Sequence, residues 1–169
     1  DLIWKHIPFV TSSELHKGLQ HILSTQHIDL VIHLAAVSDY LPDQLQTASQ
    51  AQQLPHTGKV SSDNDSFILT FKQNHKLVQM VRAYSKNPSM KLIAFKLTAG
   101  ATEGEQKKAV MRLVTSVHPD MVIANDMVNR AGGIQQSFSV FDPEDLDRPH
   151  QAAQVSDLAQ HFVNYLEKL

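Results

Sequence analysis

Apolar residues recur at helical spacing in four segments of the chain. In the first segment, Leu15 is followed by apolar positions four, seven and eight residues later, which places one stripe along a helix. Thr11, Ser12 or Ser13 can cap this helix, because each offers a side-chain oxygen to the unpaired amides of the first turn. The later stripes comprise Leu77, Met80, Val81 and Tyr84, then Val110, Leu113, Val114 and Val117, and last Leu158, Phe162, Tyr165 and Leu166. The spacing therefore predicts four helices.

Short apolar runs lie between these helices. Residues 28–37, 92–97 and 121–124 are nearly continuous runs, as in strands that are covered on both faces. Residues 67–71 and 138–141 alternate between apolar and polar positions, which also favours strands. Strands that alternate with helices of this length predict an α/β fold with an open, mostly parallel Rossmann-like sheet and helices on both faces.

One polar stretch interrupts this pattern. Residues 43–57 are rich in Gln, Ala and Ser and show weak periodicity, so the sequence predicts a long connection there. A connection of this length in a compact domain is typical of a lid or a binding loop. We otherwise expect residues 1–169 to form a single α/β domain.

Composition narrows the classes of function. The chain has 169 residues with a formal net charge of −2, which lacks the basic footprint of a nucleic-acid-binding protein. Cysteine is absent, which excludes a disulfide framework and a cysteine nucleophile. The apolar run from Leu30 to Val37 is too short for a membrane span and contains His33. The 10 histidines show no metal-binding motif, and we expect them to be scattered and solvent-facing. We expect a cytoplasmic protein without nucleic-acid or membrane partners.

Candidate chemistry lies after the predicted strands, because ligands of open α/β sheets bind beyond the carboxyl ends of the strands. After the first run, the small side chains of Ala35 and Ala36 let a ligand approach the backbone, and Asp39 follows. Its carboxylate suits a ribose hydroxyl or a nucleotide-bound Mg²⁺, although capping of the next turn explains it equally well. Lys59 stands beside a glycine and two serines, where it suits a phosphate, but most loop lysines are solvated.

Two later strands add an aromatic and an amide side chain. Phe95 and Lys96 are neighbours in one predicted strand, and since alternate residues face opposite sides, at most one of them faces a ligand. Asn125 follows the next strand directly and reaches the same edge of the sheet, where it binds a ligand or caps a turn.

Four sequence blocks in this order resemble the phosphopantothenate–cysteine ligase family. The blocks are Ala-Ala-Val-Ser-Asp-Tyr from Ala35, Gly-Lys-Val-Ser-Ser from Gly58, Ile-Ala-Phe-Lys-Leu from Ile93 and Val-Ile-Ala-Asn-Asp from Val122. Each block alone is weakly specific, but four in register are specific. They resemble most the small monofunctional bacterial form of the family.

The resemblance implies roles for individual residues. It makes Lys59 the catalytic lysine and puts Asp39 at the nucleotide and its Mg²⁺. It puts Phe95 near the nucleotide, although Ala94 replaces the usual glycine of the family's Gly-Phe block. We also expect Ala36 and Asn125 at the nucleotide, because both lie at the ends of predicted strands. The family pattern begins with a glycine-rich phosphate loop. Because the chain opens with Asp rather than Met and no such loop is present, we expect that segment upstream, and residues 1–169 alone to bind CTP poorly.

The implied reaction joins 4′-phosphopantothenate to cysteine in coenzyme A biosynthesis. The substrate carboxylate attacks the α-phosphorus of CTP, or ATP in some relatives, and the amine of cysteine then displaces the nucleoside monophosphate. The family also implies a homodimer. Two alternatives stay open: a short-chain dehydrogenase or epimerase, which the absence of Tyr-x-x-x-Lys disfavours, and a non-catalytic nucleotide-binding module.

Overall fold

The computed structural model describes residues 5–47, 51–54, 62–63, 65–131 and 133–167. The chain divides into two compact units. The smaller unit comprises Asp1–His16 and Ala36–Leu77, and the larger comprises Lys17–Ala35 and Val78–Leu169. Four helices are described, at the places where the apolar stripes predict them: α1 (Ser12–Thr25), α2 (Leu77–Tyr84), α3 (Glu103–Val117) and α4 (Val155–Leu166).

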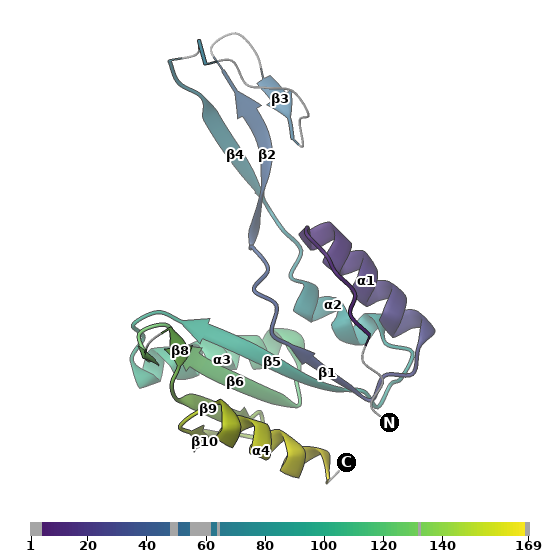
Figure 1. The fold of residues 1–169 in the computed structure, drawn as a ribbon, viewed down its shortest axis with the longest axis vertical. Coiled ribbons are helices and arrows are strands. Elements are labelled where there is room, and N and C mark those ends of the chain that lie inside the picture. Colours follow the sequence, from purple (N-terminus) through teal and green to yellow (C-terminus); the bar gives the residue numbers. More distant parts are fainter. Residues whose placement is uncertain (1–4, 48–50, 55–61, 64, 132, 168–169) are drawn as a thin grey trace. The chain divides into compact units, whose positions relative to one another are not determined.

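The larger unit contains a five-stranded sheet in the order β1-β5-β6-β9-β10 (Figure 1). Its strands are β1 (Leu30–His33), β5 (Lys91–Thr98), β6 (Met121–Asp126), β9 (Phe138–Asp142) and β10 (Asp145–Ala152). Strands β1, β5 and β6 are parallel, whereas β9 is antiparallel to both of its neighbours. Four of the five strands therefore run in the same direction, which confirms the predicted mostly parallel sheet.

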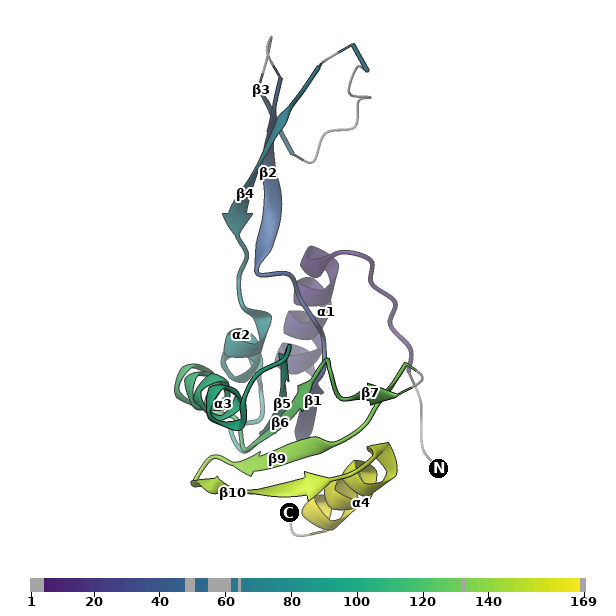
Figure 2. The ribbon, with the colours of Figure 1, turned by 90° about the vertical axis from the view of Figure 1, so that its left-hand side faces the viewer.

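Helices cover both faces of this sheet, as predicted. On one face, Leu92 packs with residues of α1, α2 and α3, among them Leu23, Val81 and Val117. On the other face, Ile93 packs with Leu158 of α4. Figure 2 shows α3 and α4 on opposite sides of the sheet. The alternation of Leu92 and Ile93 explains why the strand reads as a continuous apolar run, since both faces are buried.

Side chains of the first turn fix the start of α3. The hydroxyl of Thr102 accepts a hydrogen bond from the backbone N–H of Glu105, and the carboxylate of Glu105 accepts one from the N–H of Thr102. This capping box satisfies amides that have no partner inside the helix. The helix ends at His118, whose left-handed conformation (φ 52°) closes its last turn before Pro119.

The smaller unit contains a three-stranded antiparallel sheet in the order β3-β2-β4. Its strands are β2 (Tyr40–Gln46), β3 (Ala51–Gln53) and β4 (Ile68–Gln73). The prediction of a long connection over residues 43–57 is wrong for its described part, because β2 and β3 occupy residues within it. Backbone pairing of Leu45 with Gln52 holds these strands together, although their side chains are mostly polar.

The sequence pattern is also imprecise elsewhere. The predicted strand over residues 28–37 is described only as β1, which ends at His33. Strand β10 was not predicted, because most of its residues are charged or polar. It pairs with β9 through a hairpin. A further two-residue hairpin joins β7 (Arg130–Ala131) to β8 (Ile134–Gln135). Among the described residues, no helix is long and apolar enough to cross a membrane.

His33 corrects the expectation that the histidines are all solvent-facing. Its side chain is half-buried at the end of β1, and its Nε2 atom is buried without a hydrogen-bond partner among the described residues. Burial lowers the pKa of His33 below its ordinary value, because the loss of hydration of the charged form outweighs a hydrogen bond to the backbone of the same residue.

We expect this histidine to make folding stability depend on pH. Since the folded-state pKa lies below the unfolded value of about 6.5, the unfolded chain takes up the proton first, and stability falls as pH drops below that value. Denaturant unfolding at pH 7.5 and 5.5 measures the loss, and His33→Leu should reduce it. His21→Gln, a change at an exposed position, is the control. An equal pH dependence in wild type and His33→Leu would contradict this origin.

Candidate functional site

A buried carboxylate joins the carboxyl ends of β5 and β6. Asp126 is only 3% exposed and accepts four hydrogen bonds. Its Oδ1 accepts from the backbone N–H groups of Gly100 (2.8 Å) and Val128 (3.0 Å), and its Oδ2 from the Thr98 hydroxyl (2.6 Å) and the N–H of Ala101 (3.0 Å). These contacts fix the loop after β5 against the loop after β6.

The hydrogen bonds to Asp126 have an electrostatic consequence. The Thr98 hydroxyl first, and then the backbone amides, favour the charged form and hold the pKa of Asp126 far below its usual range. Gly100 contributes to this arrangement through its backbone, since its positive φ of 65° aims the amide at the carboxylate in a conformation that other residues rarely adopt. The loop is therefore pre-formed around a negative charge at neutral pH.

Asn125 precedes this carboxylate and is held by a glutamine. Its Nδ2 donates to Oε1 of Gln135 at 3.1 Å. The Nε2 of Gln135 donates to the carbonyl oxygens of Asp126, Asn129 and Gln136 at 2.9 to 3.1 Å. The side-chain amide of Gln135 thus links several backbone carbonyls of the segment after β6 with one another and with the end of β6.

Phe95 and Asn125 lie on the same face of the sheet. In the register of β5 and β6, Phe95 pairs with Ile123 and Leu97 with Asn125, so all four positions share one face. Phe95 is half-buried against the cluster that contains Ile93 and α4. Next to it, Leu97 is 43% exposed, which leaves apolar surface open near Asn125. An aromatic ring, apolar surface and a side-chain amide together suit a heteroaromatic base.

Ala36 and Asp39 belong to the smaller unit, where both are exposed. The turn at Asp39 is held by other groups: the Ser38 hydroxyl donates to the carbonyl of Tyr40, and the amide of Asn74 donates to the carbonyl of Ser38. No hydrogen bond or ion pair of the Asp39 carboxylate is found within the described ranges. Turn capping therefore does not account for this carboxylate. Lys59 lies outside the described residues.

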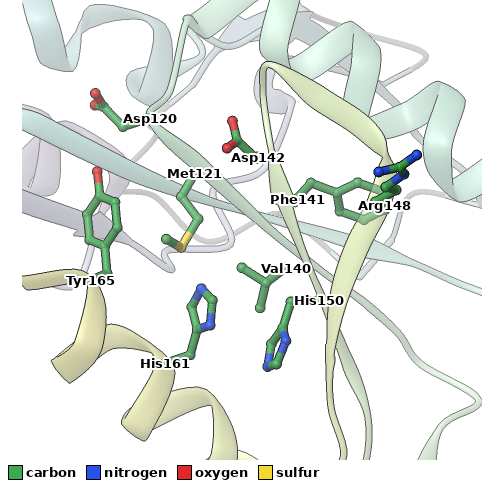
Figure 3. Close-up of a pocket in the computed structure, with 9 residues that line it drawn as sticks. All are labelled: Asp120, Met121, Val140, Phe141, Asp142, Arg148, His150, His161 and Tyr165. Atoms are coloured by element: carbon green, nitrogen blue, oxygen red, sulfur yellow. The ribbon is translucent and has the colours of Figure 1, made fainter. Parts of the chain in front are cut away.

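A pocket that was not predicted lies at the other end of the strands, away from Asn125 and Asp126 (Figure 3). It has a volume of about 210 Å³ at the amino end of β6. Asp120 and Tyr165 lie at one end, and the stacked rings of His150 and His161, 4.8 Å apart, lie at the other. The histidines come from β10 and the helix that follows it, α4, and because they lie in two different elements, the periodicity of neither element could reveal the pair.

Ion pairs support the wall of this pocket. Asp120 accepts from Arg82 at 2.6 Å, from Lys91 at 3.2 Å and from the backbone N–H of Leu92 at 2.7 Å. Burial alone would raise the pKa of Asp120, but these hydrogen bonds outweigh it and lower the pKa. Burial and the charge of Asp120 raise the pKa of Tyr165. Asp120 thus links Arg82 of α2 to β5. These contacts indicate that Asp120 stabilises the fold rather than binding a ligand.

Comparison with known proteins identifies the family. The family described as DNA/pantothenate metabolism flavoprotein C-terminal domain matches residues 4–169. The chain belongs to this family. The match confirms the family resemblance drawn from the four sequence blocks, and it favours that family over the short-chain dehydrogenases. A search among curated proteins finds no significant match.

Solved structures share the fold at low sequence identity. The DNA/pantothenate metabolism flavoprotein from Streptococcus pneumoniae superposes with a TM-score of 0.75 at 20% identity, over 95% of this chain and 71% of that one. A Cab2 mutant in complex with phosphopantothenate-cysteine gives 0.64 at 17% identity, over 96% and 54%. The C-terminal domain of the coenzyme A biosynthesis bifunctional protein CoaBC gives 0.57 at 14% identity, over 93% and 61%. The chain thus spans between 54% and 71% of these relatives.

The structure brings together only part of the predicted site. Phe95 and Asn125 share one sheet face in the larger unit, whereas Ala36 and Asp39 belong to the smaller one. Gln135, which lies ten residues after Asn125, was not predicted. Its signal was present in part, because the glycine pair before it predicts the turn in which Gly133 lies, with φ of 80°.

Proposed function

We propose that the protein containing this chain is a phosphopantothenate–cysteine ligase. The observation that carries the proposal is the match of the family of pantothenate metabolism over residues 4–169. The Cab2 relative, whose complex contains phosphopantothenate-cysteine, supports the nature of the product. The four sequence blocks, which lie within the matched residues, support it with a lysine, a carboxylate, an aromatic ring and an amide.

The proposed reaction proceeds in two steps with CTP, or alternatively ATP, as cosubstrate. The carboxylate of 4′-phosphopantothenate attacks the α-phosphorus and releases pyrophosphate, which leaves an acyl-nucleotide. The amine of cysteine then attacks the acyl carbonyl, the amide bond forms, and the nucleoside monophosphate leaves with the electron pair. Negative charge grows on phosphate and acyl oxygens in both steps, and Lys59 would stabilise it. Phe95 and Asn125 would hold the base.

A magnesium ion fits the proposed role of Asp39. Mg²⁺ uses one or two carboxylates together with substrate phosphates, and an exposed carboxylate without a partner among the described residues meets that requirement. When bound, the ion would neutralise phosphate charge. The role of Asp39 would be to present one oxygen ligand to the ion. Ser38 and Asn74 hold the turn at Asp39 in place.

Pyrophosphate release tests the proposal in the natural full-length protein. With 4′-phosphopantothenate and CTP or ATP, we expect pyrophosphate without cysteine only to about one equivalent of enzyme, and continuous release with cysteine. Mass spectrometry should detect phosphopantothenoylcysteine. Absence of both, with every nucleoside triphosphate, would rule out the ligase and favour a non-catalytic module.

Asp39→Asn should weaken nucleotide binding and raise the Mg²⁺ concentration needed for half-maximal turnover by roughly tenfold, because the change keeps the shape and removes one charged contact. Titration of turnover with Mg²⁺ measures the effect. Asp65→Asn, at another exposed carboxylate of the same unit, is the control. If neither the Mg²⁺ requirement nor the nucleotide affinity changes, Asp39 is not a ligand of the ion.

We also propose that the protein forms a homodimer through the three-stranded sheet of the smaller unit. All six residues of the edge strand β4 are exposed, among them Ile68 (62%) and Phe71 (55%). An exposed, apolar edge strand is a surface that proteins normally cover. Sedimentation at micromolar concentration should give twice the chain mass, and Phe71→Glu should reduce it to the mass of one chain.

The expectation that the protein is cytoplasmic also stays a prediction.

A further inference from the structure

The hydrogen-bond network around Gln135 fixes the direction of its side-chain amide. Its Nε2 lies 3.1, 3.0 and 2.9 Å from the carbonyl oxygens of Asp126, Asn129 and Gln136. Carbonyl oxygens only accept hydrogen bonds, so the nitrogen and not the oxygen of Gln135 must face them. Its Oε1 therefore faces the opposite way, towards Asn125.

This direction in turn determines the direction of the Asn125 amide. Because Oε1 of Gln135 is an acceptor, Asn125 must present its Nδ2 to it, at 3.1 Å, and the Nε of Arg130 donates to the same oxygen at 3.4 Å. The carbonyl oxygen Oδ1 of Asn125 is consequently the group left for a ligand, and no partner of Oδ1 is found in the part of the chain that the structure describes. The site presents an acceptor rather than a donor.

Neighbouring contacts make this arrangement rigid. Asp126 follows Asn125 directly, and its carboxylate holds the loop after β5, while its carbonyl oxygen accepts from Gln135. The end of β6 is thus held on both sides, and rotation of the Asn125 amide would place two acceptors, its Oδ1 and Oε1 of Gln135, face to face. An acceptor fixed in this way discriminates between ligand groups, because a mismatched ligand oxygen leaves polar groups unpaired.

We propose that Gln135 is a positioning residue that fixes the carbonyl oxygen of Asn125 towards the nucleotide base, and so selects bases with an exocyclic amino group over bases with an oxo group in its place. The inference rests on the proposed function, in which Asn125 contacts the base. Cytosine and adenine carry such an amino group, whereas uracil and hypoxanthine carry the oxo group at the same position. CTP and UTP, like ATP and ITP, therefore differ in the exocyclic group that would contact the carbonyl oxygen of Asn125.

The test compares kcat/KM for CTP and UTP, and for ATP and ITP, in the natural full-length protein. We expect wild type to prefer the amino member of the pair that it uses. Gln135→Met has a similar volume and removes both polar ends of the side chain. It should lower the preference about tenfold, on the scale of one net hydrogen bond, mostly through KM. Gln136→Met is the control, since the side chain of that neighbouring exposed glutamine makes no hydrogen bond among the described residues.

Asn125→Ala keeps the inference testable if Gln135→Met does not fold. It should also remove the preference. Where Gln135→Met folds, it should change nothing further in the Asn125→Ala background. Equal losses for both members of a pair, with an unchanged preference, would overturn the inference and leave the ligase intact. A wild-type protein without nucleotide-dependent pyrophosphate release would overturn the proposed function, and this inference with it.

Discussion

Lys59→Ala should lower ligase turnover by about 10²-fold or more while the fold stays intact. The loss of one preorganised charge that stabilises a developing oxyanion typically has an effect of this size. Both proposed steps build negative charge, on phosphate oxygens first and on the acyl oxygen second, so either step would slow. The prediction rests on the sequence block Gly-Lys-Val-Ser-Ser and on the family match, since Lys59 lies outside the described residues.

Two measurements separate catalysis from binding and from folding in this experiment. Single-turnover pyrophosphate release reports the first step, and the KM for nucleotide reports binding. Lys76→Ala, a change of an exposed lysine in the same unit, should leave turnover within about twofold of wild type. Near-normal turnover of Lys59→Ala would remove this lysine from the proposed mechanism.

The hydrophobic pattern predicted the larger unit well, because its elements are buried in regular ways. Leu92 and Ile93 lie on opposite faces of β5 and both are fully buried, which produces the continuous apolar run. The stripe with Leu158 in α4 packs on one face only, which produces the helical period. Where burial has a simple geometry, periodicity is sufficient to predict the element.

The smaller unit and the loop after β6 were harder to predict for a physical reason. Strands β2 and β3 are held by backbone pairing and carry mostly polar side chains such as Gln44 and Gln53, so no alternation marks them. The role of Gln135 depends on contacts with backbone carbonyls, which have no sequence signature. The position of Asn125 at the carboxyl end of a buried strand was predictable, although β6 continues to Asp126 and includes it. The direction of its amide was not predictable.

Asp126→Ala should lower the melting temperature on the order of 10 °C, because it leaves three backbone amides and the Thr98 hydroxyl without their shared acceptor in a site that is almost fully buried. Asp65→Ala, at an exposed carboxylate, should have little effect. The loop that contains Gly100 should lose its protection against amide hydrogen exchange in Asp126→Ala, since it would open without global unfolding.

The same carboxylate should contribute to stability in a pH-dependent way. Its folded-state pKa lies below the unfolded value of about 3.9, so the stabilisation is fully present above that pH and is lost as pH falls below it. Asp126→Asn, which cannot titrate, should therefore show a flatter loss of stability between pH 5 and 3 than wild type. If both proteins lose stability equally over this range, hydrogen bonds to the charged form of Asp126 are not what joins the ends of β5 and β6.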